Sequence, residues 1–523
     1  MELKQKVIHR KYEKKEARSQ ITIGDDYSIP EGKPDISALL QKKAEIRVDE
    51  VHTETGKIRI HGTLKLWVLY VTERSGETLS NLLMEFPFDE ILYMEGAVSG
   101  DQLKIDWNIE ELGVTIIHPG KLSVRALVAL QGLILGTEAC PLTECPEERN
   151  DLCIKQETFP AAEPVLEKKD SYRVRDEVLL PANKPNVQEI LWKDLQVRGL
   201  DLRQQEGRLA VKGEILLFVV YRSEDDQLMI QWYEQTIPFQ GTTEVEGLTQ
   251  EMFGVPETEI VHQEIELKPD YDGELRMFQI DLLLDISMHF YEEHTCSVLS
   301  DLYSTKEQLS LQMQELSYER LRMCTQTKCR VSGQEHLEEG AKILQILSHQ
   351  VQLRQKQSQI MKEGIQWEGI LEVQVLYITD HDSQPFGSAA FLLPCSQLIE
   401  IPEIQKEDRW ILRENVEQLF LTMPEENQIE ARGVIGLNVC VMEQCRRQNI
   451  TAVTGECYDP EAEKKRPGIL LHFVQPKETL WDIAKANHTT MEEIRKLNEL
   501  PVEDVVPGQK MLLLKQREGC LLG

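Results

Sequence analysis

Residues 61–70 read HGTLKLWVLY, and two later stretches repeat their pattern, KGEILLFVVY at 212–221 and EGILEVQVLY at 368–377. In each stretch a glycine precedes a tyrosine by eight residues, and a proline follows the tyrosine after seventeen more. Successive tyrosines are 151 and 156 residues apart (221 − 70 and 377 − 221). This period is too long for the repeat of a solenoid, so the sequence predicts three tandem copies of one domain.

Each repeated stretch has the pattern of a β-strand. Apolar side chains recur at every second position before the tyrosine, which places them on one face of a sheet. The second half of each stretch is apolar on both faces, as in a strand that runs through a domain interior. The shared glycine indicates a β-bulge or a close backbone approach. A later strand is expected to close each unit, at residues 122–130, 278–286 and 429–437.

The segments between these strands are expected to be turns, short helices and looser stretches. Lys33-Pro34 and Lys184-Pro185 stand at the same place in the first two repeats, and each precedes a segment predicted as a short helical turn. Residues 137–149 and 293–319 are predicted as loose stretches between units, and a partly helical conformation remains open for 293–319. Each unit is therefore expected to be a β-sandwich or barrel with one small helix. Polar turns after the tyrosines are expected at residues 72–77, 223–227 and 379–384.

Length and composition favour several folded domains. At 523 residues the chain is too long for a single core, and 41% apolar with 28% charged residues is typical of a folded soluble protein. The net charge of −31 argues against nucleic-acid binding, which needs a basic surface, and against adsorption to an anionic membrane. Neither a secretory signal nor a bilayer-spanning apolar segment is recognisable, so the sequence predicts a cytoplasmic protein.

No pattern in the sequence predicts catalysis. The chain contains no GxxxxGK[ST] phosphate loop, no GxSxG elbow and no HExxH helix. Its eleven cysteines include three CxxxxC pairs, which are wider than the usual zinc knuckles, and the odd total favours reduced thiols. We therefore expect no enzyme, no bound metal and no cofactor. The three pairs are Cys140/Cys145, Cys324/Cys329 and Cys440/Cys445.

Residues 472–515 have a different pattern, strand–helix–helix–strand. Thr479 can cap the first helix, and Thr490 with Glu493 forms a capping box for the second. Pro507-Gly508 then marks a turn before an apolar closing strand. The segments TLWDIA, EEIRKLN and VPGQKMLLL, in this order and spacing, resemble a LysM module. That resemblance implies a βααβ fold of the kind that commonly binds polymers containing N-acetylglucosamine.

The resemblance also implies a binding surface on the loops of this module. LysM modules usually have Pro-Gly-Asp before the first helix, where this chain has Pro476-Lys477-Glu478. Loss of the glycine removes a permissive backbone position and places side chains where a sugar would approach. A protein ligand and a glycan ligand both remain open, and the altered loop favours the protein. The predicted surface comprises Pro476, Lys477, Glu478, Thr479, Leu480, Trp481, Asn498, Pro507 and Gly508.

Trp481 has two open interpretations within this surface. It can fill the core of the helical hairpin, or it can contact the ligand. The two differ in what its replacement would do, because a core residue supports folding and a contact residue supports binding alone.

The whole arrangement resembles the SipL/SpoVID-type spore coat morphogenetic proteins, in which tandem SPOCS domains precede a C-terminal LysM module. The resemblance rests on the glycine–tyrosine–proline spacing of the repeats and on the LysM-like end. It implies a non-enzymatic scaffold in the mother-cell cytoplasm, at the forespore surface, that helps the spore coat assemble. The implied partners are the coat basement-layer ATPase SpoIVA, contacted through the LysM-like end, and other coat proteins. A peptidoglycan- or N-acetylglucosamine-glycan-binding protein is the alternative.

The expected fold class is mainly β. Three tandem β-sandwich or barrel-like repeats with short helices precede a small α+β module of the LysM type. The predicted boundaries are 1–145, 146–300 and 301–457 for the repeats, 458–468 for a linker and 469–517 for the LysM module.

Overall fold

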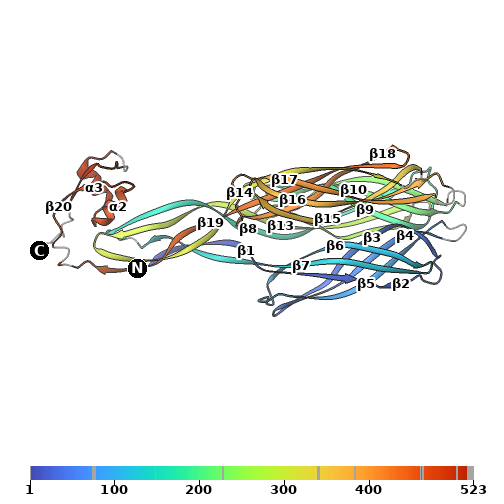
Figure 1. Ribbon diagram of the computed structural model, residues 1–523, viewed down its shortest axis with the longest axis horizontal. Helices are drawn as coiled ribbons and strands as arrows, with labels where there is room; N and C mark the ends of the chain where they lie inside the picture. Colours follow the sequence, from blue (N-terminus) through green and yellow to red (C-terminus); the bar gives the residue numbers. More distant parts are fainter. Residues whose placement is uncertain are drawn as a thin grey trace.

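The computed structural model describes residues 2–72, 78–147, 149–225, 229–337, 342–381, 385–459, 461, 465–501 and 505–514. Three β-rich units lie side by side, and a small module with two helices sits at one end of the molecule (Figure 1). Parts of several sequence predictions lie outside the described residues. They are the turn residues 73–77, 226–227 and 382–384, linker residues 460 and 462–464, and residues 515–517.

Each unit consists of two antiparallel sheets with an apolar core between them. Unit one contains β1 (Leu3–Ile23), β2 (Asp26–Ser28), β3 (Ile36–Glu54), β4 (Lys57–Thr72), β5 (Leu79–Tyr93), β6 (Gln102–His118) and β7 (Lys121–Pro146). Unit two contains β8 (Leu152–Leu179), β9 (Val187–Gln205), β10 (Arg208–Ser223), β11 (Ile230–Glu244), β12 (Glu257–Pro269) and β13 (Leu275–Ser304). Unit three contains β14 (Glu307–His336), β15 (Ile343–Met361), β16 (Gly364–Thr379), β17 (Phe386–Glu400), β18 (Arg409–Glu425) and β19 (Gln428–Cys457).

The repeated sequence stretch forms the middle strand of one sheet in every unit, namely β4, β10 and β16. The late strand predicted to close each unit is the middle strand of the other sheet, namely β7, β13 and β19. Middle strands are paired on both sides, so their alternate apolar side chains reach the core of the sandwich. The prediction of a mainly β, repeated architecture is confirmed.

The shared glycine marks a bulge, as predicted. The preceding strand is shifted in register opposite Gly62, Gly213 and Gly369. In the first two units an aromatic ring also covers the glycine, since a Cβ atom on Gly62 or Gly213 would lie 2.7 Å from the ring of Phe88 or Phe239. Any larger side chain at these two positions would displace that ring from the core.

The helical turns predicted after Lys33-Pro34 and Lys184-Pro185 are wrong. Both segments are extended, because β3 and β9 begin there and pair with β4 and β10 over their whole length. The prolines contribute in a different way: the hydroxyl groups of Tyr70 and Tyr221 donate hydrogen bonds to the carbonyl oxygens of Pro34 and Pro185, at 3.0 and 3.3 Å. The repeated tyrosine therefore anchors the start of the preceding strand.

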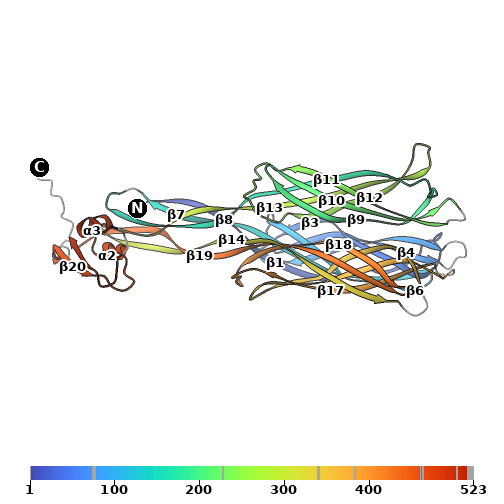
Figure 2. The ribbon, with the colours of Figure 1, turned by 90° about the horizontal axis from the view of Figure 1, so that it is seen from above.

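The predicted loose stretches between units are also strands. Residues 137–146 continue β7, and residues 293–319 belong almost entirely to β13 and β14. The outer ends of β1/β7, β8/β13 and β14/β19 leave the sandwiches together and form a narrow stalk, as two perpendicular views show (Figures 1 and 2). We define the stalk as residues 3–12, 136–146, 152–163, 292–304, 307–320 and 443–457.

Apolar side chains from all three units hold this stalk together. Ile8 and Leu142 come from unit one, Phe159 from unit two, and Leu316 and Tyr318 from unit three, and all belong to one buried cluster. In a separate unit these apolar side chains would be exposed on the extended strands. Their burial against the strands of the neighbouring units therefore stabilises the stalk.

The three units are joined into a closed ring. Equivalent residues Leu40, Leu191 and Leu347, one from each unit, are buried in a shared apolar cluster. They are separated by 151 and 156 residues, the same offsets as the repeated tyrosines. The sequence predicted tandem domains; the structure adds that each unit packs against both others, so their inward faces cover one another.

Polar contacts link every pair of units in this ring. Lys43 of unit one forms an ion pair with the buried Asp194 of unit two at 3.0 Å. Arg198 of unit two contacts the His349 ring of unit three at 3.0 Å. Asn449 of unit three donates to the carbonyl of Pro141 in unit one at 2.9 Å. The repeats are thus one assembled head with a stalk.

Candidate functional site

A cavity of about 1000 Å³ lies where the three units meet. At this junction Glu257 of unit two binds Lys104 of unit one at 2.9 Å and Arg413 of unit three at 2.7 Å. Burial opposes ionisation of Glu257, but these two cations lower its pKa. Removal of any one of these three groups would leave a partly buried charge without its partner.

Neither a metal centre nor a membrane span is found within the residues that the structure describes. No three His, Cys, Asp or Glu side chains are grouped closely enough to hold a metal ion. No helix there is long and apolar enough to cross a bilayer.

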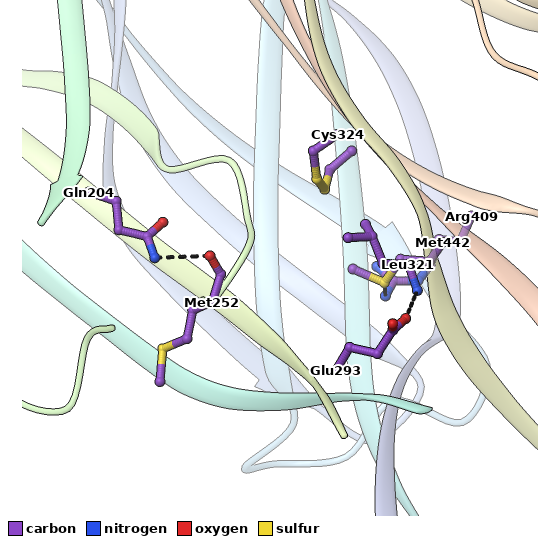
Figure 3. The surroundings of a disulfide bond; sticks show 8 residues. Gln204, Met252, Glu293, Leu321, Cys324, Arg409 and Met442 are labelled. Atoms are coloured by element: carbon purple, nitrogen blue, oxygen red, sulfur yellow. Dashed lines mark hydrogen bonds between the residues drawn. A yellow bond between two sulfur atoms is a disulfide. The ribbon is translucent and has the colours of Figure 1, made fainter. Parts of the chain in front are cut away.

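One pair of cysteines departs from the expectation of reduced thiols. Cys324 on β14 and Cys440 on β19 form a disulfide, with 4.1 Å between their Cα atoms. The two residues stand directly opposite each other in the β14–β19 register, which brings together halves of two different CxxxxC pairs. Figure 3 shows the surroundings of this bond, where Glu293 of unit two accepts a hydrogen bond from the Leu321 backbone at 2.9 Å.

The C-terminal module is the best candidate for a binding site. It contains β20 (Ile469–Phe473), α2 (Leu480–Ala486), α3 (Met491–Asn498) and β21 (Lys510–Leu514). The two strands pair antiparallel, and the helices cover one face of the ribbon. The βααβ order predicted from the sequence is confirmed.

Both predicted helix caps are present. Thr479 caps α2, and the Asp482 carboxylate accepts hydrogen bonds from the Thr479 hydroxyl and backbone at 2.6 and 3.0 Å. These two bonds lower the pKa of Asp482. Thr490 and Glu493 form the capping box of α3. The caps satisfy backbone N–H groups that would otherwise lack partners, and so fix where each short helix begins.

The loop between β20 and α2 keeps the backbone shape that a glycine would allow. Lys477 has a φ of +68°, in the left-handed region where non-glycine residues are disfavoured. Glu478 stabilises the loop because its carboxylate accepts from the Gln475 N–H and contacts the His472 ring, both at 2.8 Å. The backbone bond from Gln475, followed by the contact with His472, lowers the pKa of Glu478.

A second turn lies beside this loop. Val474 donates to the Gln509 carbonyl at 3.0 Å and accepts from the Gly508 N–H at 2.8 Å. Gly508 has a φ of +84°, which a turn with Pro507 before it requires. Of the predicted surface residues, Pro476, Lys477, Thr479, Pro507 and Gly508 are exposed on these two neighbouring turns, and Glu478 is half-buried.

The remaining three residues of the predicted surface are held inside the structure. Leu480 is buried in the core of the module. Trp481 is 6% exposed and packs against Tyr303, which belongs to unit two. Asn498 bonds both backbone groups of Leu512, donating at 2.8 Å and accepting at 2.7 Å, so it ties α3 to β21.

The outer face of the β20–β21 ribbon is a site that sequence reasoning missed. Ile469, Leu471 and Phe473 are 66%, 52% and 48% exposed, and Leu514 opposite Ile469 is 45% exposed. Alternation places these side chains on the face away from the helices. Both strands are apolar at successive positions, whereas a ribbon covered on one face needs apolar residues only at alternate positions. The sequence therefore contained a signal for this exposed apolar face.

Comparison with protein families matches the chain at four places. The SipL, SPOCS domain family matches residues 35–117, 186–268 and 342–423, and the LysM domain family matches residues 472–513. Neither the curated proteins nor the solved structures contain a match to the chain. The SPOCS matches span β3 to β6 and their equivalents, so all six stalk-forming strands lie outside them.

The chain is therefore a repeat protein of binding domains, and no enzyme family is among its matches. It carries three SipL SPOCS domains followed by a C-terminal LysM domain, the architecture of the SipL/SpoVID-type proteins. These domains define a sporulation protein associated with the spore coat.

Proposed function

We propose that this protein is a non-enzymatic scaffold of spore coat assembly, which docks a coat protein through its LysM domain. The observation that carries the proposal is the apolar outer face of β20–β21, formed by Ile469, Leu471, Phe473 and Leu514. Contiguous exposed apolar side chains mark surfaces that bind a partner, and apolar side chains form the core of protein–protein interfaces.

The proposed partner is the coat basement-layer ATPase SpoIVA, together with other coat proteins, in the mother-cell cytoplasm at the forespore surface. Several docking faces on one chain would raise the effective concentration of coat components at the growing shell. Closure of the three SPOCS units into a ring supports a role in which these faces keep fixed relative positions.

A pulldown of SpoIVA with a Leu471→Glu variant tests the docking face. Leu471 is half exposed, so the substitution leaves the core of the domain intact. Full burial of a leucine contributes about 1.5–3 kcal/mol, so burial of the exposed half contributes about 0.8–1.5 kcal/mol and its loss should lower the affinity about four- to tenfold. Lys496→Glu, at an exposed position on α3, is the control and should bind normally. Unchanged binding of Leu471→Glu would exclude this face.

Two further experiments test the partner and the location. Deletion of residues 469–514 should abolish recovery of SpoIVA, and unchanged recovery would show that the partner contacts another part of the chain. A fluorescent fusion in sporulating cells should form a ring around the forespore. A diffuse signal, or one spread over the cell wall, would contradict the proposed location.

Glycan binding is the second candidate, and the loop backbone favours it. Lys477 holds the left-handed conformation that a glycine would take, so the path of the loop is retained. Exposed Pro476 and Thr479 lie on the loop before α2, and exposed Pro507 lies on the neighbouring turn before β21. Titration calorimetry with chitin oligomers distinguishes the two candidates. Weak or absent binding is expected, and a micromolar dissociation constant would favour the glycan.

A further inference from the structure

The LysM domain contacts the SPOCS units at the tip of the stalk. The Tyr303 ring, near the end of β13, packs edge-on against Trp481 of α2 with 4.9 Å between ring centroids. Both side chains are almost fully buried, at 4% and 6% exposure. The Tyr303 hydroxyl also donates to the carbonyl of Thr489 at 2.8 Å. Tyr303 therefore completes the core of the LysM domain although it belongs to unit two.

A single carboxylate joins this aromatic contact to a charged one. Asp301 accepts a hydrogen bond from the Trp481 indole N–H at 2.8 Å. The same carboxylate receives the Lys485 ammonium group at 2.6 and 2.8 Å. Trp481 and Lys485 are four residues apart on α2, so they stand on the same face of the helix. Asp301 thus recognises one face of α2 through two directional, charge-assisted bonds.

The linker adds a third contact on the same side. Tyr458 donates from its hydroxyl to the carbonyl of Ser304 at 3.1 Å, and its ring stacks on His488 at 3.8 Å. Through Tyr458, the linker predicted from the sequence therefore contacts both the stalk and the LysM domain.

We propose that Asp301 and Tyr303 form a dock that holds the LysM domain in one fixed orientation at the stalk tip. If residues 458–468 acted only as a flexible tether, their root-mean-square end-to-end distance would be about 18 Å, and the LysM domain could take many positions. The dock removes this freedom and turns head, stalk and LysM domain into one rod (Figures 1 and 2).

The dock leaves the proposed ligand face free. Ile469, Leu471 and Phe473 lie on β20, whereas the docked side chains Trp481 and Lys485 lie on α2. A partner on the outer sheet face can therefore bind while the domain stays docked. The inference itself concerns orientation alone and holds whatever the LysM ligand is.

Single-molecule energy transfer on the full chain tests the dock. Dyes attached through non-natural residues at positions 6 and 496, both exposed, report the distance between the stalk and α3. The wild type should give one narrow distance distribution. Asp301→Ala should raise the undocked, broadly distributed population at least about tenfold, the factor expected for loss of a charge-assisted hydrogen bond.

Two further variants separate the dock from general effects on folding. Lys485→Gln removes the charge from the LysM side and should broaden the distribution in the same direction. Glu157→Gln, which removes a stalk carboxylate bound to Arg447 of unit three at 2.7 Å, should leave it narrow. A broad wild-type distribution, or a narrow one in both Asp301→Ala and Lys485→Gln, would overturn the proposal. Circular dichroism confirms that each variant is folded.

Discussion

Acidification should loosen the contact between units two and three through His349. This side chain lies on β15 against unit two, where its Nε2 atom accepts from the Arg198 guanidinium at 3.0 Å. Gln196 of unit two donates to the His349 carbonyl at 2.7 Å, so the backbone is held as well. Burial, and then the positive charge of Arg198, lower the pKa of His349 to about 4, although Asp194 opposes the shift. The folded protein therefore needs this imidazole neutral.

The size of the effect follows from the two pKa values. In the unfolded chain the group titrates near its ordinary value of 6.5. Stability from the neutral form is fully present above that value and is lost as the pH falls toward the folded pKa. At pH 5 the unfolded chain has gained the proton and the folded protein has not, which costs about 2 kcal/mol. The loss is about 3 kcal/mol at pH 4 and is complete, at about 3.4 kcal/mol, near pH 3.

Urea unfolding at pH 7.5 and pH 5 measures this loss. His349→Gln keeps an acceptor near Arg198 but cannot titrate, so the variant should lose about 2 kcal/mol less than wild type between the two conditions. Burial also lowers the pKa of His289, but that residue is present in both proteins and cancels. His294→Gln, at an exposed site, is the matched control. An equal pH effect in wild type and His349→Gln would refute the reasoning.

Three other substitutions have definite expected outcomes. Lys477→Gly should raise the thermal stability of the LysM domain by about 0.5–1 kcal/mol, because it relieves a left-handed φ; calorimetry showing a lower melting temperature would contradict this. Leu191→Ala, at the centre of the ring, should cost about 2–5 kcal/mol in urea unfolding, while Leu83→Ala, at a half-exposed position, should cost far less. Asn498→Ala leaves both backbone groups of Leu512 without these bonds and should destabilise the LysM domain by about 2 kcal/mol; amide exchange at Leu512 that stays slow would argue against it.

Much of the secondary structure could be predicted from local patterns. The alternation that ends at Tyr70, Tyr221 and Tyr377 identified three central strands because a side-chain period of two is a property of the strand itself. The caps at Thr479 and Thr490 were equally readable, since a capping box needs only residues three positions apart.

The errors arose where distant strands decide the conformation. Residues after Lys33-Pro34 read as a helical turn, yet pairing with β4 makes them a strand. Residues 137–146 read as loose because they are rich in Pro, Glu and Cys, and residues 293–319 had no clear pattern. Apolar side chains of these strands are buried against the ribbons of the other units, which no local window contains.

The candidate site was only partly readable for the same reason. The loop residues Pro476, Lys477 and Pro507 were identified by analogy with LysM modules, and they are exposed. The sequence left open whether Trp481 is a core residue or contacts the ligand. The answer depends on Tyr303, which packs against Trp481 and lies 178 residues earlier (481 − 303). The exposed face of β20 depends on which side the two helices cover.

The sequence by itself determined the three-fold repetition, the β class of the repeats and the LysM end, because each follows from spacings within one segment. Only the tertiary structure decided that the repeats close into a ring around Leu40, Leu191 and Leu347, that their outer strands extend into a stalk, and that Asp301 and Tyr303 receive the LysM domain. Those features depend on burial and hydrogen bonds between residues more than a hundred positions apart. These interactions stabilise the protein only after the units have packed together.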